Sequence, residues 1–276
     1  MPDWFEKTPI GELVDVAARR FETKEALCYE GNRWTFGQLK DEVDRVASGL
    51  IQLGIHPGEK VALWMPNRPE WIHSLFAVAK IGAVLVPINT RFRTNDLEYV
   101  VRQSDSETLI TVDRSGPVDY LGMVRELCPE VETGDPNLLC PEAFPELRRI
   151  VVLGDTNYRG TVRWESILSS AEATPSRVLE QRQQMVDPDS PALIMYTSGT
   201  TGFPKGVVHT HNILRNVNDE ANRMGMTPRD VILMYLPLFH AFGLYEGPLM
   251  SAMTGARTVL TNAFDPGEAL QLIQRE

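Results

Sequence analysis

Apolar residues along this chain alternate between a helical spacing and short uninterrupted runs. The helical spacing is clearest at Phe36, Leu39, Val43, Val46, Leu50 and Leu53. Thr35 and Gln38, just before this series, have the spacing of a capping box, in which each side chain binds the other residue's backbone N–H. A helix is therefore predicted to begin after Thr35. Gly54 predicts its end, because glycine readily adopts the left-handed conformation that closes many helices.

Short apolar runs predict strands that are buried on both faces. They occupy residues 61–65, 83–86, 108–112, 149–153, 192–196, 231–235 and 258–261. Helices are predicted between them, at residues 69–81 and 96–103, from about His209, and from Pro266. Uninterrupted apolar strands that alternate with amphipathic helices are typical of a largely parallel sheet. We therefore predict an α/β fold of layered sheets with helices on both faces.

Two irregular segments divide the chain. Residues 115–146 are rich in Pro, Gly and acidic side chains and are expected to form a surface excursion. Residues 169–190 are polar and are expected to form a connector that is helical in part. A second series of strands and helices starts beyond it. We expect an N-terminal α/β subdomain over residues 1–186 and the start of a second one over residues 187–276.

Composition excludes some classes of protein. The 27 Lys and Arg against 37 Asp and Glu give a net charge of −10, which disfavours a general nucleic-acid surface. The first residues lack a signal-peptide pattern, and no apolar run approaches the roughly 20 residues of a membrane span. Cys28, Cys128 and Cys140 are too widely spaced for a zinc motif. We expect reduced, structural thiols in a cytoplasmic protein.

One loop carries candidate chemistry. The apolar run at 192–196 leads directly into Thr197, Ser198, Gly199, Thr200, Thr201 and Gly202, and Lys205 follows closely. Glycines that expose backbone N–H groups, together with hydroxyls and a lysine, supply the donors that a polyphosphate requires. The order of residues matches neither a Walker A loop nor a GxGxxG motif. Spacing alone therefore leaves phosphate binding and a plain exposed turn both open.

The complete run at residues 196–206 resembles the phosphate-binding signature of the adenylate-forming superfamily. This superfamily includes acyl- and aryl-CoA synthetases, peptide-synthetase adenylation domains and luciferases. Other family-like segments follow in the expected order, at residues 34–39, 66–70, 80–84, 87–89 and 236–240. The resemblance covers nearly the whole chain and is weakest at 115–170. It is greatest to the N-terminal part of acyl-CoA synthetases of the fatty-acid–CoA ligase type.

The resemblance implies a reaction and a phosphate site. Family members join a small-molecule carboxylic acid to ATP, with Mg²⁺, and then usually transfer the acyl group to coenzyme A. The residues implied to bind the β- and γ-phosphates are Thr197, Ser198, Gly199, Thr200, Thr201, Gly202 and Lys205. Lys205 would stabilise the charge that builds on the departing pyrophosphate. A hydroxyl of Thr197 or Thr200 would help to hold Mg²⁺.

The resemblance also implies an acid-binding site beyond the strand at 231–235. In relatives, the histidine that matches His240 lies beside the acyl carboxylate, so His240 and Lys205 are the expected catalytic residues. The alternative for His240 is a packed histidine that caps a helix. Phe239, Phe242 and Gly243 are expected to shape the substrate pocket with His240, and core packing is their alternative.

Two further groups of polar residues are given no chemical role. His209 and His211 lack a carboxylate or cysteine partner at a useful spacing, so we do not assign them to a metal. Four arginines are expected to be solvated charges on the surface. These are Arg91, Arg93, Arg148 and Arg149.

The resemblance further implies a C-terminal continuation. Relatives carry an adenine motif, a ribose-binding aspartate, a hinge and a small mobile domain, none of which is found by residue 276. We expect an N-terminal part with little ligase activity alone, and with exposed apolar surface that favours self-association. Three hypotheses stay open: the parent is an acyl-CoA ligase, the chain is a non-catalytic nucleotide-binding module, or the acceptor is a carrier-protein thiol. A fatty acid is expected ahead of an aromatic acid.

Overall fold

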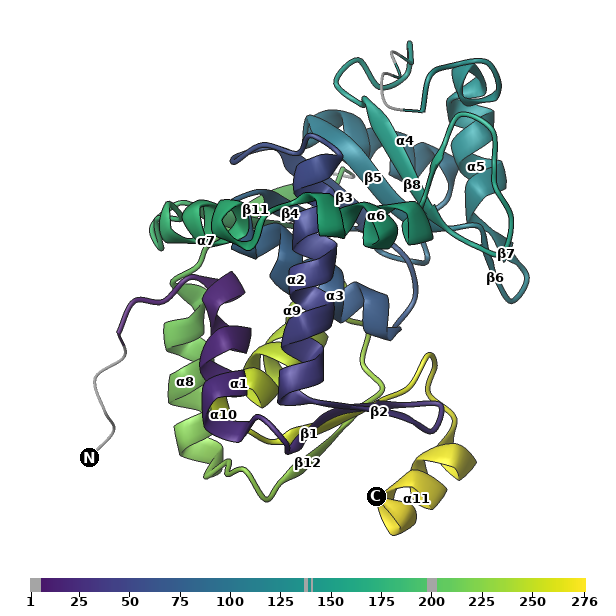
Figure 1. The fold of residues 1–276 in the computed structure, drawn as a ribbon. Helices are drawn as coiled ribbons and strands as arrows, with labels where there is room; N and C mark the ends of the chain where they lie inside the picture. Colours follow the sequence, from purple (N-terminus) through teal and green to yellow (C-terminus); the bar gives the residue numbers. More distant parts are fainter. Residues whose placement is uncertain (1–5, 137–138, 140, 198–202) are drawn as a thin grey trace.

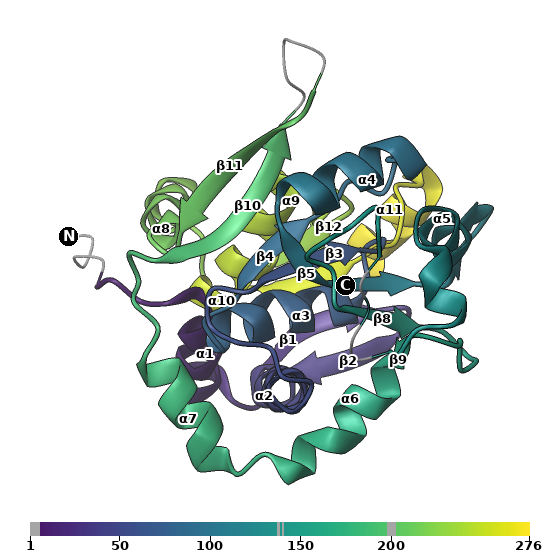
Figure 2. The ribbon, with the colours of Figure 1, turned by 90° about the horizontal axis from the view of Figure 1, so that it is seen from above.

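The computed structural model describes residues 6–136, 139, 141–197 and 203–276, which form two main β-sheets and the helices around them (Figure 1). Strands of the larger sheet are β3 (Lys60–Trp64), β4 (Val84–Pro87), β5 (Ser106–Val112), β8 (Arg149–Leu153), β9 (Val162–Arg163), β10 (Pro191–Thr197) and β11 (Lys205–Thr210). Their order is β11-β10-β4-β3-β5-β8-β9. All neighbours are parallel except β10 and β11, which form an antiparallel hairpin at one edge (Figure 2). The prediction of a largely parallel sheet is confirmed.

The smaller sheet combines strands from the two ends of the chain. Its strands are β1 (Glu25–Tyr29), β2 (Asn32–Thr35), β12 (Val231–Met234) and β13 (Arg257–Leu260), in the order β12-β13-β1-β2. Only β2 runs antiparallel to its neighbour. Each of the two sheets therefore takes strands from both sides of the expected boundary after residue 186. The division into subdomains at that point stays a prediction.

Helices lie between the sheets and on their outer faces. In Figure 1, α2 (Phe36–Gln52) and α3 (Pro69–Lys80) fill the layer between the sheets, where α2 contacts β1 and β2 and α3 contacts β3 and β4. On the opposite face of the larger sheet lie α4 (Thr94–Gln103) and α5 (Tyr120–Leu127), and α11 (Pro266–Arg275) lies against the smaller sheet. The other α-helices are α1 (Leu13–Phe21), α6 (Trp164–Ser170), α7 (Ser176–Gln184), α8 (Ile213–Met224), α9 (Ala241–Leu244) and α10 (Met250–Thr254). The predicted layered α/β fold is confirmed.

Smaller elements occupy the segments between these layers. A short ribbon pairs β6 (Arg114–Ser115) with β7 (Val118–Asp119), and 3₁₀ turns occur at Ile10–Glu12, Pro129–Glu132 and Ala171–Ala173. The connector expected at 169–190 contains α7 and is therefore helical in part, as predicted. Within the described residues, no helix combines the length and apolar character needed to cross a membrane. Cys28 and Cys128 are buried free thiols, whereas Cys140 lies outside the described residues.

Local capping signals act as the sequence predicts. The backbone N–H of Gln38 donates to Thr35 Oγ1 at 3.2 Å, and that of Thr35 donates to Gln38 Oε1 at 2.9 Å. The capping box at the start of α2 is therefore formed. At its other end, Gly54 has a φ of +84°, in the left-handed region that glycine tolerates. These two signals fix α2, the helix that separates the two sheets.

The helix expected from about His209 is present as α8, but its predicted start is wrong. His209 lies in β11, and α8 begins four residues later at Ile213. The segment is extended because it pairs with β10, with Val208 opposite Ile194. Pairing with a strand already in the sheet supplies backbone hydrogen bonds along the hairpin, which outweighs the weak helical pattern.

The expectation of a solvated charge is wrong for Arg149. Its guanidinium is buried and lies 2.5 Å from the Glu59 carboxylate, and it also donates to Thr108 Oγ1 at 2.9 Å. A buried arginine is tolerated here because an opposite charge and a hydroxyl satisfy its donors. The other three arginines expected to be solvated are exposed. These are Arg91, Arg93 and Arg148.

Large apolar side chains remain exposed at several places, among them β11 and α11. On β11, Val208 is 57% exposed, and on α11 Leu270 and Ile273 are 69% and 68% exposed. Exposed apolar side chains are therefore present, and that a further part of the protein packs on them stays a prediction. Self-association through them also stays a prediction.

Candidate active site

The residues predicted to hold phosphate flank a loop at the carboxyl end of β10. Thr197 is the last residue of β10 and pairs with Lys205, the first residue of β11. Both are exposed. Ser198, Gly199, Thr200, Thr201 and Gly202 lie outside the described residues. Open α/β sheets bind ligands beyond the carboxyl ends of their parallel strands, so Thr197 and Lys205 meet where a ligand is expected.

Two aromatic contacts hold this end of the hairpin against α4. The ring of Phe203 stacks on Tyr99, with centroids 5.2 Å apart and planes at 30°. From β10, the Tyr196 hydroxyl donates to Gln103 Oε1. Burial raises the pKa of Tyr196 to about 12, which keeps the phenol protonated and able to donate. Helix α4 thus contacts the hairpin at residues on both sides of the predicted phosphate loop, residues 198–202.

Sequence reasoning missed the supporting role of α4. Tyr99 and Gln103 are four residues apart, so they lie on one face of a helix. That spacing was visible in the sequence. Their partners Tyr196 and Phe203, however, are about a hundred residues away, and only the fold brings them together.

His240 lies where β12 is followed by α9. It is the N-cap of α9, where its Nδ1 accepts a hydrogen bond from the backbone N–H of Phe242 at 3.3 Å. The capping alternative is therefore observed, but the ring is exposed instead of packed. Because Nδ1 is the acceptor, a neutral ring carries its hydrogen on Nε2. An Nε2–H on this exposed ring can donate to a carboxylate or a phosphate.

The three other predicted pocket residues differ in exposure. Phe239 is half-buried, Phe242 is 50% exposed and Gly243 is buried. A Cβ on Gly243 would lie 2.3 Å from the carbonyl oxygen of Pro237. Glycine therefore lets α9 close against the segment that precedes His240. Their role in an acyl pocket stays a prediction.

The helical segment after His240 contacts the hairpin. The Tyr245 hydroxyl lies 3.3 Å from His209 Nδ1 and 3.8 Å from Met195 Sδ. Burial raises the pKa of Tyr245 and lowers the pKa of His209, so both groups are held neutral. Tyr245 begins a π-helical turn, Tyr245–Leu249, and such turns are frequent at functional sites. This contact joins the segment that carries His240 to the strand that carries Lys205.

Magnesium fits this arrangement as an ion that arrives with a phosphate ligand. Among the described residues, no group of three or more His, Cys, Asp or Glu side chains could hold a metal ion. Mg²⁺ is commonly held by one or two protein oxygens together with substrate phosphates and water. Thr197, predicted to supply such an oxygen, is exposed, and its role stays a prediction. Thr200 lies outside the described residues.

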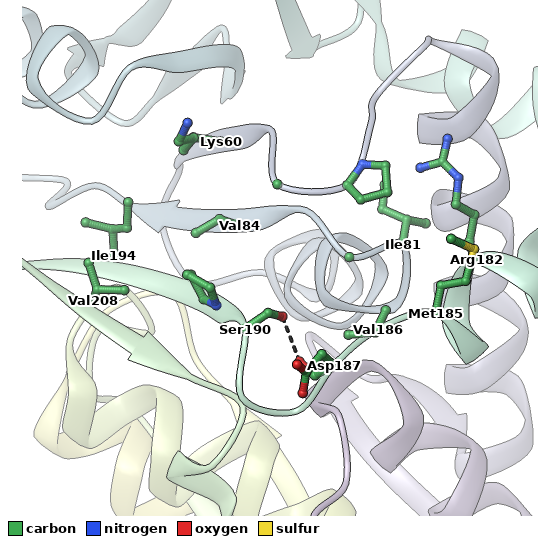
Figure 3. Close-up of a pocket in the computed structure, with 14 residues that line it drawn as sticks. Lys60, Ile81, Val84, Arg182, Met185, Val186, Asp187, Ser190, Ile194 and Val208 are labelled. Atoms are coloured by element: carbon green, nitrogen blue, oxygen red, sulfur yellow. Dashed lines mark hydrogen bonds between the residues drawn. The ribbon is translucent and has the colours of Figure 1, made fainter.

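A separate groove of about 650 Å³ lies toward the amino ends of the parallel strands (Figure 3). Lys60 and Val84, which line it, begin β3 and β4. Ile194 and Val208 add apolar surface from the hairpin. Nucleotides bind at the carboxyl ends of such strands. We therefore do not assign this groove to ATP.

Sequence relatives of this chain are acyl-CoA ligases. YngI of Bacillus subtilis (strain 168), assigned as an acyl-CoA synthetase, is 35% identical over 270 residues, which cover 97% of this chain and 49% of YngI. The human mitochondrial medium-chain acyl-CoA ligase ACSF2 is 32% identical over 277 residues, which cover 97% of this chain and 45% of ACSF2. The chain thus spans about half the length of the curated relatives it matches.

Solved structures show the same fold. The inhibitor-bound N-terminal domain of FACL13 from Mycobacterium tuberculosis superposes with a TM-score of 0.78 at 27% identity, over 96% of this chain and 60% of that domain. The family model described as AMP-binding enzyme matches residues 14–276, which include both sheets and the candidate site. The chain therefore belongs to the AMP-binding enzyme family, the adenylate-forming ligases that its sequence resembles.

Proposed function

We propose that this chain is the part of an acyl-CoA synthetase that holds the phosphates of ATP while a carboxylic acid is activated as an acyl-adenylate. One observation carries the proposal: Thr197 and Lys205 pair at the carboxyl end of β10, on either side of the predicted phosphate loop. An ammonium group and a hydroxyl at the end of a parallel strand are suitable donors for a polyphosphate. Family membership and the relatives' names support the same function.

The proposed chemistry has two steps. First, a carboxylate oxygen of the acid forms a bond to the α-phosphorus of ATP, and the bond from that phosphorus to pyrophosphate breaks. Lys205 stabilises the charge that builds on the leaving pyrophosphate, and bound Mg²⁺ would neutralise part of the same charge. Second, the sulfur of coenzyme A bonds to the acyl carbon, AMP leaves, and the thiol proton is released.

Site residues divide between these two substrates. We assign the phosphates of ATP to Thr197, Ser198, Gly199, Thr200, Thr201, Gly202 and Lys205, with Thr197 and Thr200 nearest to Mg²⁺. We assign the acid to Phe239, His240, Phe242 and Gly243. His240 donates from Nε2–H to the substrate carboxylate and orients it for attack.

The acid we propose is aliphatic. Phe239 and Phe242 give apolar surface on both sides of His240 along the chain. The human relative is named a medium-chain acyl-CoA ligase, which supports an aliphatic chain ahead of an aromatic ring.

Binding of Mg·ATP to the 276-residue chain, measured by calorimetry, tests the phosphate site. Replacing Lys205 by alanine removes a charge-assisted contact, so the dissociation constant should rise about 10- to 100-fold. Lys60→Ala is the matched control, because Lys60 lies at the amino end of the same sheet, in the separate groove. Equal binding by the wild type and Lys205→Ala would contradict the assignment. Weaker Mg·ATP binding by Lys60→Ala alone would indicate that the phosphates bind in the groove instead.

Carboxylate-dependent exchange of pyrophosphate into ATP tests the reaction and the acid. A panel of aliphatic acids of increasing length and of aromatic acids is assayed with the full-length protein, and the aliphatic acids should give the higher rates. The same assay with residues 1–276 should show little exchange. Robust exchange there would refute the expected inactivity of this part alone, and preference for benzoate-like acids would refute the proposed substrate.

A further inference from the structure

Asn67 lies where the two sheets meet near the candidate site. It follows β3 of the larger sheet and is only 5% exposed. Its side-chain Nδ2 donates to the carbonyl oxygens of Leu236 at 2.9 Å and of Thr261 at 3.1 Å. Its Oδ1 accepts from the backbone N–H of Leu238 at 2.9 Å. All three bonds reach segments that follow strands β12 and β13 of the smaller sheet.

The chemistry of these bonds selects asparagine. An amide offers two N–H donors and an acceptor oxygen, and both donors and the oxygen of Asn67 are used. A carboxylate has no donor for the two carbonyl groups, and an apolar side chain of the same size has neither donor nor acceptor. Buried backbone groups that lose their partner are costly, so this position tolerates few alternatives.

The segment that Asn67 holds is the segment that carries His240. Leu236 and Leu238 precede His240 by four and two residues, and Leu238 is fully buried. The backbone N–H of His240 donates to the carbonyl oxygen of Pro237 at 3.1 Å, which closes a tight turn. The two bonds from Asn67 thus fix the residues on either side of Pro237, and with them the start of α9.

We propose that Asn67 is a positioning residue for His240. It fixes the His240 loop, residues 236–240, against the end of β3, and β3 belongs to the same sheet as the β10–β11 hairpin that carries Thr197 and Lys205. The histidine is thereby held at a set place relative to the sheet that carries Thr197 and Lys205. The catalytic consequence rests on the proposed function of His240, whereas the structural consequence does not.

Two measurements on the 276-residue chain test the positioning directly. One is the exchange rate of the Leu238 backbone amide, and the other is the ring signal of His240 in a histidine-labelled NMR spectrum, assigned with His240→Gln. Asn67→Ala should accelerate Leu238 exchange at least about tenfold, which corresponds to the loss of one typical buried hydrogen bond. It should also shift the His240 signal while the signals of the buried His73 and His211 stay in place.

A matched control separates positioning from general loss of stability. Thr111 is fully buried on β5 and donates to the carbonyl oxygen of Trp64, the last residue of β3, at 2.8 Å. Thr111→Val removes this buried hydrogen bond beside β3 and leaves the three bonds of Asn67 intact. It should change neither Leu238 exchange nor the His240 signal.

Two further substitutions keep the test decisive if Asn67→Ala does not fold. Asn67→Asp preserves the side-chain volume but places a carboxylate oxygen against the two carbonyl groups, so it should displace the His240 signal as much as alanine does. Asn67→Ser retains one donor and one acceptor on a shorter side chain and should give an intermediate shift. A folded variant with the wild-type Leu238 exchange rate and His240 signal would overturn the inference.

Kinetics of the full-length protein connect positioning to catalysis. A displacement of about 1 Å in a reacting group can lower a rate about 100-fold, so Asn67→Ala should lower kcat for adenylation by that order and leave the KM for ATP nearly unchanged. If His240→Gln adenylates normally while Asn67→Ala still shifts the loop, the proposed role of His240 fails and the positioning stands. If kcat and the loop are both unaffected in Asn67→Ala, the positioning itself fails.

Discussion

At the scale of single residues, Gly243 sets how closely α9 approaches the His240 loop. A methyl group there would lie 2.3 Å from the Pro237 carbonyl oxygen, far inside contact distance. Gly243→Ala should therefore lower the free energy of unfolding by about 1–3 kcal/mol, as overpacking does elsewhere, and shift the His240 ring signal. Urea unfolding and NMR measure the two effects.

Gly267→Ala is the control for Gly243→Ala. Gly267 lies in the first turn of α11, where its nearest neighbour to an added Cβ is a side-chain oxygen of Asp265 at 3.2 Å. Alanine there should leave stability within about 1 kcal/mol of the wild type or raise it, because it restricts the unfolded chain. Equal destabilisation by both substitutions would show that the close approach at Gly243 is unimportant.

At the scale of elements, the stacking of Phe203 on Tyr99 ties the β10–β11 hairpin to α4. In a double-mutant cycle of Phe203→Ala and Tyr99→Ala, we expect a coupling of about 0.5–1.5 kcal/mol in the free energy of unfolding. Each single substitution should also weaken Mg·ATP binding, because the adjacent phosphate loop loses an anchor. Calorimetry measures this second effect.

The stacking of Tyr235 with Phe264 provides the matched control for that cycle. Its rings lie 4.8 Å apart beyond the ends of β12 and β13, and Tyr235 and Phe264 are 41% and 58% exposed. Tyr235→Ala and Phe264→Ala should show a coupling of similar size in the free energy of unfolding. Neither substitution should change the affinity for Mg·ATP. If both cycles affect Mg·ATP binding alike, the anchoring role of α4 is wrong.

Elements with signals inside their own sequence were predictable. The capping box identified the start of α2, and the apolar run at 149–153 coincides with β8. By contrast, β1 was missed, since its partner β13 lies more than two hundred residues away and pairs Leu27 with Thr258. The strand β11 was not predicted, and its last two residues were assigned to the following helix, because its extended form depends on pairing with β10. Strand identity here is decided by tertiary pairing as much as by local pattern.

The candidate site shows the same limit. Thr197 and Lys205 could be identified because they belong to one continuous signature. Asn67 could not be connected to His240, because the bonds that join them cross between two sheets. Arg149 was misplaced for a similar reason, since the carboxylate that makes its burial tolerable belongs to Glu59, ninety residues earlier. Local sequence shows which groups can do chemistry, and packing between distant segments decides where they lie.

At the scale of the whole molecule, the candidate site spans the junction of the two sheets. The larger sheet supplies the β10–β11 hairpin, and the smaller sheet leads into the segment with His240. Contacts of Asn67, and the contact between Tyr245 and His209, join these parts. The placement of the two sheets relative to each other therefore sets the geometry of the site. Conditions that change the stability of the fold should also change its activity.

Two buried histidines make the stability of the molecule depend on pH. Burial lowers the pKa of His73 to about 4, and it does the same for His211, whose Nδ1 accepts the backbone N–H of Ile10 at 3.0 Å. In the unfolded chain, histidine binds a proton near pH 6.5. The unfolded state thus binds more protons between pH 6.5 and 4. The stability present above pH 6.5 is lost as the pH falls, by roughly 3 kcal/mol for each histidine at pH 4.

Glu246 opposes this loss, so substitutions are needed to separate the contributions. Burial and the neighbouring Glu220 raise the pKa of Glu246 to about 7. The ionised carboxylate therefore destabilises the fold above pH 7, and this penalty is relieved as the pH falls toward the unfolded pKa of about 4.3.

Urea unfolding at pH 7.5, 6 and 4.5 measures how steeply the free energy of unfolding changes with pH. His73→Leu and His211→Gln should each flatten the loss of stability on acidification, whereas Glu246→Gln should steepen it, because relief of the carboxylate penalty no longer offsets protonation of the histidines. A wild-type slope in both histidine variants would show that other groups control the acid sensitivity of this fold.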